Sequence, residues 1–298
     1  NYMKYRIADG TSIPANGYLV VTQDDHFGNL SDSGCIIPFA LSENGETVYL
    51  RSGAGNETSG YYLTGYLDQE DFGPAEIAVA FGRHIKSDGD INFVAMSTNT
   101  PGSLTGGSPY FTGAANAYPK VGPIIINEIM YNPPDGGSWD HDEYEYVELY
   151  NISGSTVYLQ EFDNILQTNL PWAFTDGIDY TFPLGTSIPS GGKIVVVKNP
   201  TAFSERHPAV PGSIIYGPYD GKLDNGGEKL ELGKPADELE GVRLYIRVDR
   251  VSYDDVAPWP VAPDGTGTSL HQKTPLTAGA NYGNDVINWM SGTPSPGQ

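Results

Sequence analysis

The sequence has almost no cysteine, since Cys35 is the single one in 298 residues. One cysteine forms no disulfide within the chain and supplies no cysteine-based zinc site. Basic residues are scarce too, with 16 Lys and Arg against 37 Asp and Glu, which gives a net charge of −21. A field of that sign repels nucleic acids and anionic bilayers, so neither is expected as a partner.

Long hydrophobic runs are also missing. No apolar stretch approaches the roughly 20 residues that a membrane-spanning helix needs. The sequence therefore predicts no transmembrane segment. It begins at Asn1 rather than at Met and shows no signal peptide, which leads us to expect a fragment or a processed product.

The motifs of common enzyme classes are absent from the sequence. It contains no HExxH zinc motif, no G-x-S-x-G nucleophile elbow, no P-loop and no G-x-G-x-x-G fingerprint. Its five histidines are isolated from one another. We therefore predict no catalytic residue and no cofactor-binding residue, and we do not expect an enzyme. A catalytic domain upstream in a parent protein stays open.

Glycine, proline and tyrosine are abundant instead, at 37, 23 and 20 residues, which suits short strands joined by tight turns. Short β-branched runs such as 194–197 and 249–253 lie between turn pairs such as Asn44-Gly45. The segment 199–207 predicts one or two helical turns that end before Pro208. Because no longer stretch has helical periodicity, the predicted class is all-β.

Two copies of one pattern fill the chain. Gly10-Thr-Ser-Ile-Pro14 recurs 175 positions later as Gly185-Thr-Ser-Ile-Pro189, and Asn44-Gly-Glu-Thr-Val-Tyr-Leu50 recurs 182 positions later as Gly226-Gly-Glu-Lys-Leu-Glu-Leu232. A near-constant spacing of this length indicates duplicated domains rather than a solenoid. We predict domains at 1–112 and 123–298, joined by a linker at 113–122.

The second copy opens with the segment 124–151, which contains two strand-like runs around a loop of Pro, Gly and Asp. The first run is apolar and β-branched. In the second run, side chains alternate between two faces: Glu145, Val147 and Leu149 lie on one, and Tyr144, Tyr146, Glu148 and Tyr150 lie on the other. The segment therefore predicts a β-hairpin.

Three motifs of this hairpin resemble the opening of the lamin-tail domain: Ile126-Asn-Glu-Ile129, Tyr131-Asn-Pro133 and Glu145-Tyr-Val-Glu-Leu-Tyr-Asn151. That family is an immunoglobulin-like β-sandwich found on nuclear lamins and on many bacterial extracellular proteins. Gly267-Thr-Ser-Leu270, Asn288-Trp289 and the closing 293–297 also resemble it. The resemblance implies two immunoglobulin-like sandwiches in tandem. The first lacks its N-terminal strands, so we expect that it does not close into a sandwich.

The resemblance also implies a function. We expect a non-catalytic binding or scaffolding module of a larger secreted or surface protein, at an extracellular or cell-surface location. Its expected partners are a protein or polysaccharide at a cell surface and the neighbouring domains of the parent chain. Two alternatives stay open. One is a carbohydrate-binding accessory module of a polysaccharide-degrading enzyme, and the weaker one is a metal- or carboxylate-dependent hydrolase.

The hairpin loop supplies the candidate site residues. Acidic side chains gather there, and hard oxygen ligands on a flexible loop suit Ca²⁺, although a solvated loop tip gives the same pattern; these residues are Asp135, Asp140, Asp142 and Glu143. No cofactor is required, and Ca²⁺ is the one candidate. Trp139 and Trp259 lie in loops, where an exposed ring could stack on a sugar or other ligand.

Glutamates of the predicted hairpin offer a second possibility. Two neighbouring carboxylates could form a glycosidase pair, but the alternation places Glu145 and Glu148 on opposite faces. We therefore predict that Glu128 and Glu145 make structural hydrogen bonds.

Overall fold

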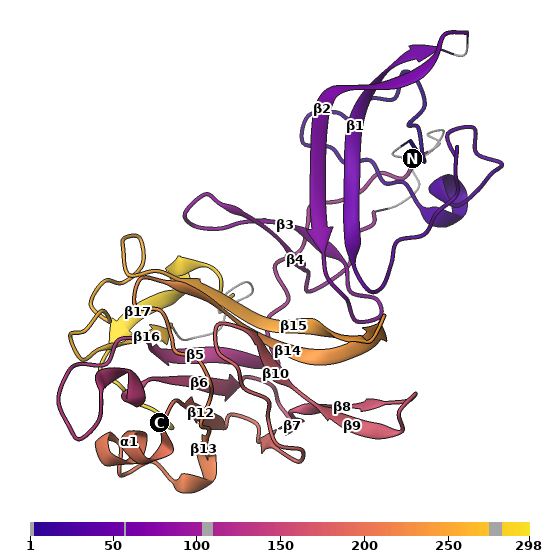
Figure 1. The fold of residues 1–298 in the computed structure, drawn as a ribbon. Coiled ribbons are helices and arrows are strands. Elements are labelled where there is room, and N and C mark those ends of the chain that lie inside the picture. Colours follow the sequence, from indigo (N-terminus) through magenta and orange to yellow (C-terminus); the bar gives the residue numbers. More distant parts are fainter. Residues whose placement is uncertain (1–2, 57, 103–109, 274–281) are drawn as a thin grey trace. The chain divides into compact units, whose positions relative to one another are not determined.

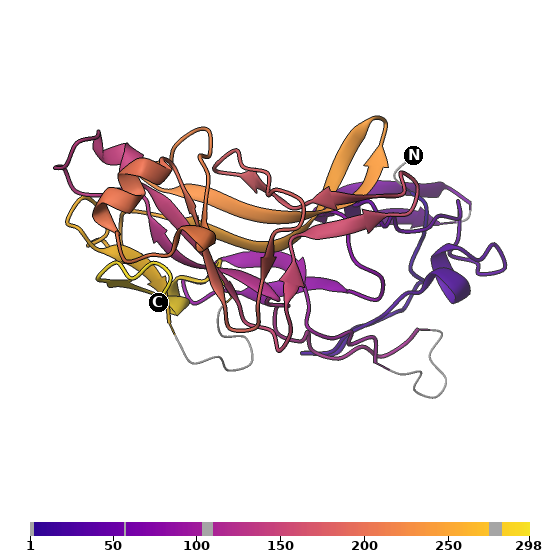
Figure 2. The ribbon, with the colours of Figure 1, turned by 90° about the horizontal axis from the view of Figure 1, so that it is seen from below.

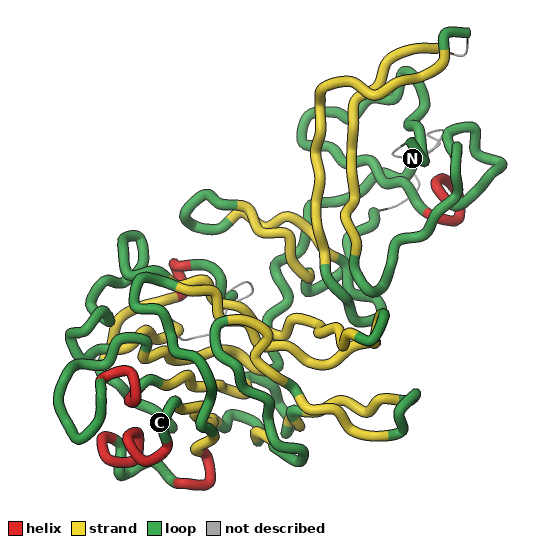
Figure 3. Tube along the Cα trace, in the orientation of Figure 1, coloured by secondary structure: helices red, strands yellow, loops and turns green. Residues whose placement is uncertain are grey.

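The chain divides into two compact units (Figure 1). A computed structural model describes residues 3–56, 58–102, 110–273 and 282–298. The first unit contains residues 1–84 and 92–118, and the second contains residues 85–91 and 119–298. Strands dominate both units and the helices are short (Figure 3), which confirms the predicted all-β class.

The first unit is built from hairpins. A π-helical turn, η1 (Gln23–Phe27), precedes β1 (Glu46–Asn56) and β2 (Gly60–Phe72), and β3 (Phe81–Ile85) and β4 (Ile91–Ala95) follow. β1 pairs only with β2, and β3 only with β4, so the described strands form two separate two-stranded sheets. A closed sandwich is not present among the described residues of this unit. The tandem arrangement of two sandwiches stays a prediction.

The second unit contains a larger sheet and a smaller one (Figure 2). The larger has the order β13-β12-β6-β5-β16-β17, made by Ile215–Tyr216, Lys193–Val197, Tyr146–Asn151, Ile124–Met130, Ser269–Gln272 and Trp289–Gly292. The smaller has the order β10-β14-β15, made by Ala173–Asp176, Glu228–Leu239 and Val242–Tyr253. Two short pairs complete the unit: β7 (Val157–Tyr158) with β11 (Ser187–Ile188), and β8 (Gln160–Asp163) with β9 (Thr168–Pro171).

The core of this unit lies between the two sheets. Side chains from the larger sheet pack against side chains from the smaller one in a single buried cluster, which includes Ile126, Val147, Leu149, Leu230, Leu232 and Val251. The opposite face of β6 is buried as well, because Tyr146 packs with Phe203 of α1 (Pro200–Arg206). Both predicted faces of this strand are thus confirmed, and burial on two sides makes β6 the centre of the sandwich.

A buried carboxylate links the two sheets. Asp249 of β15 accepts a hydrogen bond from the backbone N–H of Ile126 at 2.8 Å. That N–H lies where the register of β5 shifts against β6, between Ile126 and Glu128. Burial raises the pKa of Asp249 to about 7, although the hydrogen bond from Ile126 acts in the opposite direction. The carboxyl therefore accepts a hydrogen bond from a backbone N–H, that of Ile126, which the pairing of β5 with β6 does not satisfy.

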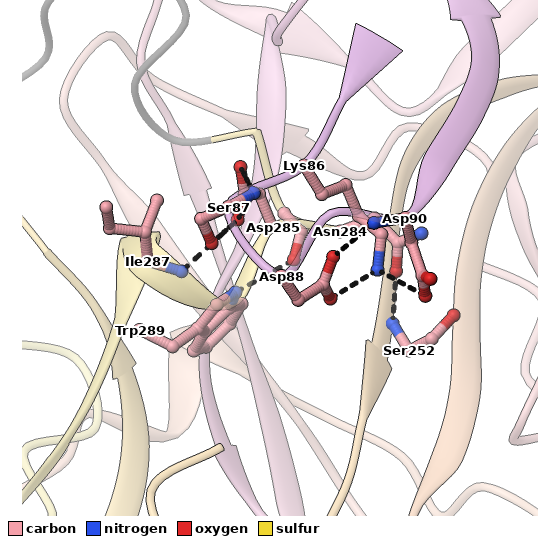
Figure 4. A network of polar contacts seen from close by, with 10 residues as sticks. Lys86, Ser87, Asp88, Asp90, Ser252, Asn284, Asp285, Ile287 and Trp289 are labelled. Carbon is pink, nitrogen blue, oxygen red and sulfur yellow. Dashed lines mark hydrogen bonds and ion pairs between the residues drawn. The ribbon is translucent and has the colours of Figure 1, made fainter. Parts of the chain in front are cut away.

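The tip of the β3–β4 hairpin belongs to the second unit (Figure 4). Ser87 donates from its backbone N–H to both carboxylate oxygens of Asp285, at 3.2 and 3.1 Å, and its hydroxyl donates to the same group. Asp285 also caps η4 (Val286–Asn288). Within the tip, Lys86 pairs with Asp88 at 2.7 Å. The domain boundaries predicted from sequence did not separate this tip from its strands.

The helices are short, and a side chain caps the start of α1. α1 begins after Asn199, whose side chain accepts hydrogen bonds from two backbone N–H groups, and it ends at Arg206, as the sequence predicted. Two further 3-10 turns are η2 (His141–Tyr144) and η3 (Gly212–Ile214). Among the described residues, no helix combines the length and the apolar character that crossing a membrane requires.

Candidate functional site

Three glutamates of the opening hairpin are wholly buried. Glu128 accepts hydrogen bonds from the hydroxyls of Tyr146 and Ser269, the latter at 2.7 Å, and from the backbone N–H of Ser295 at 3.1 Å. Its side chain is 0% exposed. These bonds join β5, β6, β16 and the C-terminal segment, so Glu128 has the structural role that we predicted.

Glu148 lies opposite Glu128 in the β5–β6 register. It accepts hydrogen bonds from Asn127 Nδ2 and from the backbone N–H of Gly297, both at 2.6 Å, and it pairs with Lys193 Nζ at 3.0 Å. Burial raises the pKa of its carboxyl, although these donors and the lysine act in the opposite direction. Glu128 and Glu148 thus hold the C-terminal segment against the sheet.

Glu145 faces the other side of β6. One carboxylate oxygen accepts hydrogen bonds from the Tyr219 hydroxyl at 2.7 Å and from the backbone N–H of Leu223 at 2.9 Å. Burial raises the pKa of Glu145 to about 7. Its side chain is also 0% exposed, and the same holds for Glu148. A substrate therefore reaches neither of these carboxylates in this conformation, and the hydrogen bonding predicted for Glu145 is confirmed.

Two acidic side chains of the hairpin loop contact the same histidine, since Asp135 lies 3.7 Å from His141 Nδ1 and Asp142 lies near Nε2 of the same ring. Asp142 pairs with His141 Nε2 at 2.8 Å and with Lys222 Nζ at 3.3 Å, and Glu143 accepts a hydrogen bond from Asn199 Nδ2 at 2.9 Å. The side chain of Asp135 is 98% exposed, and Asp140 precedes η2 without capping it. Among the described residues, no three acidic, His or Cys side chains are grouped as metal ligands. Calcium binding here stays a prediction that this geometry does not favour.

The two tryptophans proposed for ligand contact lie in different environments. Trp139 is 41% exposed, and its backbone N–H donates to the hydroxyl of Tyr144 at 3.3 Å. Trp259 is only 9% exposed and packs on Trp289, with 6.1 Å between the ring centroids. The expectation that Trp259 is open to a ligand was therefore wrong, because the sandwich core accepts its ring. Ligand binding by Trp139 stays a prediction.

A cavity of about 500 Å³ lies beside the hairpin loop. Its lining includes loop residues 133–137 and, from the end of α1, Arg206 and His207. Arg206 Nη2 donates to the carbonyl oxygens of Pro134, at 2.7 Å, and Gly136, and its guanidinium lies 3.4 Å from the centroid of the Tyr144 ring. Arg206 therefore fixes the loop on α1, and Trp139 follows two residues after the lining residue Gly137.

His207 gives the cavity a polar group. Burial lowers the pKa of its imidazole, and the ring packs against Tyr146 with 5.6 Å between centroids. Apolar walls come from Met130, Pro133 and Pro294. Concave sites with apolar walls and a few polar groups are typical of small-ligand binding. Sequence reasoning missed Arg206 and His207, and their position at the end of the predicted helical turns was the available signal.

Residues 118–255 match the family model of the Lamin Tail Domain. This part of the chain is a lamin tail domain. It extends from the residues before β5 to the end of β15 and so contains the opening hairpin, α1 and most of both sheets. The lamin-tail resemblance and its immunoglobulin-like β-sandwich are thereby confirmed for the second unit, whereas nearly all of the first unit lies outside the match.

Other comparisons add little to the lamin tail domain match. No curated protein matches the chain significantly. A crystal structure of a DUF4876 family protein from Bacteroides thetaiotaomicron has 14% sequence identity, with 84% of this chain and 89% of that chain covered. Its TM-score of 0.35 is too low to indicate a shared fold.

Proposed function

We propose that this chain is a non-catalytic binding and scaffolding module of a larger secreted or surface protein. The observation that carries the proposal is the state of the three hairpin glutamates, which are wholly buried and hydrogen-bonded within the lamin tail domain. Carboxylates used that way order strands and do not serve a substrate. The module positions neighbouring domains of its parent and binds a protein or polysaccharide at an extracellular surface.

A carbohydrate-binding accessory role is the second candidate, and one specific observation favours it. The half-exposed Trp139 follows the loop that lines the cavity of Arg206 and His207. A flat ring suits the apolar face of a sugar, and hydrogen-bonding groups suit its hydroxyl edges. The high net negative charge favours a neutral polysaccharide over an acidic one.

Binding of the whole chain to cellulose, xylan and peptidoglycan tests this second role. Trp139→Ala is expected to weaken binding at least about tenfold, a loss typical of an aromatic hot spot. Tyr158→Ala is the matched control, because Tyr158 is a 59% exposed aromatic on β7. If the chain binds none of the three, the carbohydrate role fails and protein binding remains.

The non-catalytic character is tested in the same samples by the release of reducing ends, with Ca²⁺ and with a chelator. We expect no release in either condition. Hydrolysis that Glu145→Gln abolishes would overturn the proposal in favour of a carboxylate-dependent hydrolase, and hydrolysis that the chelator abolishes would favour a metal-dependent one. Binding that requires Ca²⁺ and is lost in Asp140→Ala with Asp142→Ala would establish the calcium site.

A further inference from the structure

Two hairpin tips of the second unit carry exposed apolar side chains. The β8–β9 tip presents Phe162, Ile165 and Leu166, which are 54%, 87% and 54% exposed, and the β14–β15 tip presents Leu239 and Val242, which are 51% and 63% exposed. Single exposed apolar residues are ordinary on a protein surface. A group of five on neighbouring tips is a patch, and patches of this kind mark interaction sites. We call these five residues the paired tips.

A largely buried ion pair holds the paired tips together. Arg243 Nη1 of β15 lies 2.9 Å from Asp163 Oδ2 of β8, and the two side chains are only 19% and 10% exposed. The same guanidinium nitrogen donates to the carbonyl of Ala236 at 2.7 Å. Because one arginine bridges both hairpins, the two apolar groups stay side by side without a partner.

The β8–β9 loop is itself ordered by Asp163. Its Oδ1 accepts hydrogen bonds from the backbone N–H groups of Ile165 at 2.7 Å and Leu166 at 2.8 Å. These bonds fix the direction of the two most prominent apolar residues of the loop. Pre-organisation of this kind lowers the cost of ordering on binding.

Acidic side chains flank the β14–β15 tip. Asp237, Glu238 and Glu240 are exposed beside Leu239. The nearby cation, Arg243, is paired with Asp163 and, at 3.3 Å, with Glu238. The patch therefore has an acidic rim on the side of the β14–β15 tip.

We propose that the paired tips dock into a partner protein whose surface has an apolar hollow bordered by Lys and Arg. The acidic rim complements such a border, and the apolar side chains fill the hollow. A second copy of this chain is a poor occupant, because the same acidic rim would meet itself. An anionic bilayer is excluded for the same electrostatic reason. The proposal does not depend on the cavity that Arg206 and His207 line.

Selection of displayed random peptides on the whole chain tests the proposal. We expect an enriched consensus with an aromatic or aliphatic centre and flanking Lys or Arg. The synthesised consensus peptide is then titrated against the chain and against Ile165→Ser with Leu166→Ser. We expect the double substitution to weaken binding at least about tenfold, as for a hot spot, and added salt to weaken it too.

Val256→Ser provides the matched control. Val256 is 57% exposed and lies beyond the far end of β15 from the paired tips, so its substitution is expected to leave peptide binding unchanged. Far-ultraviolet circular dichroism of each variant confirms that the strands are retained.

Four results would overturn the proposal. The first two are the absence of any consensus and a consensus that lacks basic residues. The third is a consensus peptide that binds the double variant as tightly as it binds the unsubstituted chain. The fourth is a loss of binding in Val256→Ser as large as the loss in the double variant. Two measurements separate the rival occupants. Sedimentation with phosphatidylcholine vesicles that the double substitution abolishes would assign the paired tips to a membrane. A concentration-dependent dimer lost in the same variant would assign them to a second copy.

Discussion

The same short motif has opposite environments in the two units. In Gly-Thr-Ser-Ile-Pro, the isoleucine of the first unit, Ile13, is 58% exposed, whereas that of the second unit, Ile188, is 0% exposed. Ile188 belongs to β11 and to the main core, while 11–14 form no strand. An identical local sequence therefore does not determine burial, which depends on the elements that pack against it.

The strand motif that follows repeats this contrast. Val48 and Leu50 of β1 are 42% and 51% exposed, and their counterparts Leu230 and Leu232 of β14 are both 0% exposed. β14 faces the larger sheet across the core, whereas β1 pairs only with β2 among the strands that the structure describes. A two-stranded sheet alone has little stability in water. The facing sheet therefore stabilises the strands of the second unit, and within the described part of the chain β1 and β2 lack that contribution.

The largest expected effect tests this contrast directly. Leu230→Ala should lower the free energy of unfolding of the second unit by about 2–5 kcal/mol, because it empties a packed core position. Urea denaturation followed by tryptophan fluorescence reports this unit alone, since all four tryptophans lie between residues 139 and 289. Val48→Ala, read by hydrogen exchange of β1 and β2, should change stability by no more than about 0.5 kcal/mol. A comparable loss in Val48→Ala would show that β1 is covered in solution.

An intermediate effect concerns pH. Burial raises the pKa of Asp249 and of Glu145 to about 7, above the range near 4 of an unfolded chain. Between these values the folded state binds more protons than the unfolded state, so the free energy of unfolding falls as pH rises from about 4 to 7. In the first unit, the hydrogen bond from Arg83 lowers the pKa of the partly exposed Asp68. The contribution of Asp68 to the free energy of unfolding therefore rises with pH, opposite to that of Asp249 and Glu145.

Thermal unfolding followed by tryptophan fluorescence at about pH 5 and pH 8 measures this dependence. The second unit should melt at a lower temperature at the higher pH. Asp249→Asn keeps an acceptor for Ile126 but cannot ionise, so it should flatten the profile and melt above the original protein at the higher pH. An unchanged slope in this variant would mean that Asp249 does not titrate in this range.

The smallest effect sharpens the boundary between the units. Ser87→Ala removes the hydroxyl that donates to Asp285, and it should cost the second unit about 1 kcal/mol. Hydrogen exchange of residues 85–91 should become faster, while exchange in β1 and β2 stays the same. Ser31→Ala, at an exposed position, is the control and should change neither. Equal exchange in both variants would place the tip outside the second unit.

The opening hairpin shows how far sequence reasoning reached. Local sequence patterns predicted its two strands and the two faces of β6. They also predicted the helical turns of α1 and the resemblance to the lamin tail domain. Alternation predicts a strand face because each side chain direction depends on the backbone alone. The candidate cavity did not follow, since Arg206 and His207 meet the loop at 133–137 only after folding.

By itself, the sequence determined strands, turns and one helix, because these depend on neighbours a few residues away. Tertiary structure alone decided which of two identical motifs is buried, as Ile13 and Ile188 demonstrate. Tertiary structure also decided that Trp259, which lies between two prolines in a loop, is buried in the core. It placed Asp249 against the backbone of Ile126, 123 positions away in the chain. The physical reason is that burial and buried hydrogen bonds belong to pairs of elements, and the pairing is fixed only when two sheets face each other.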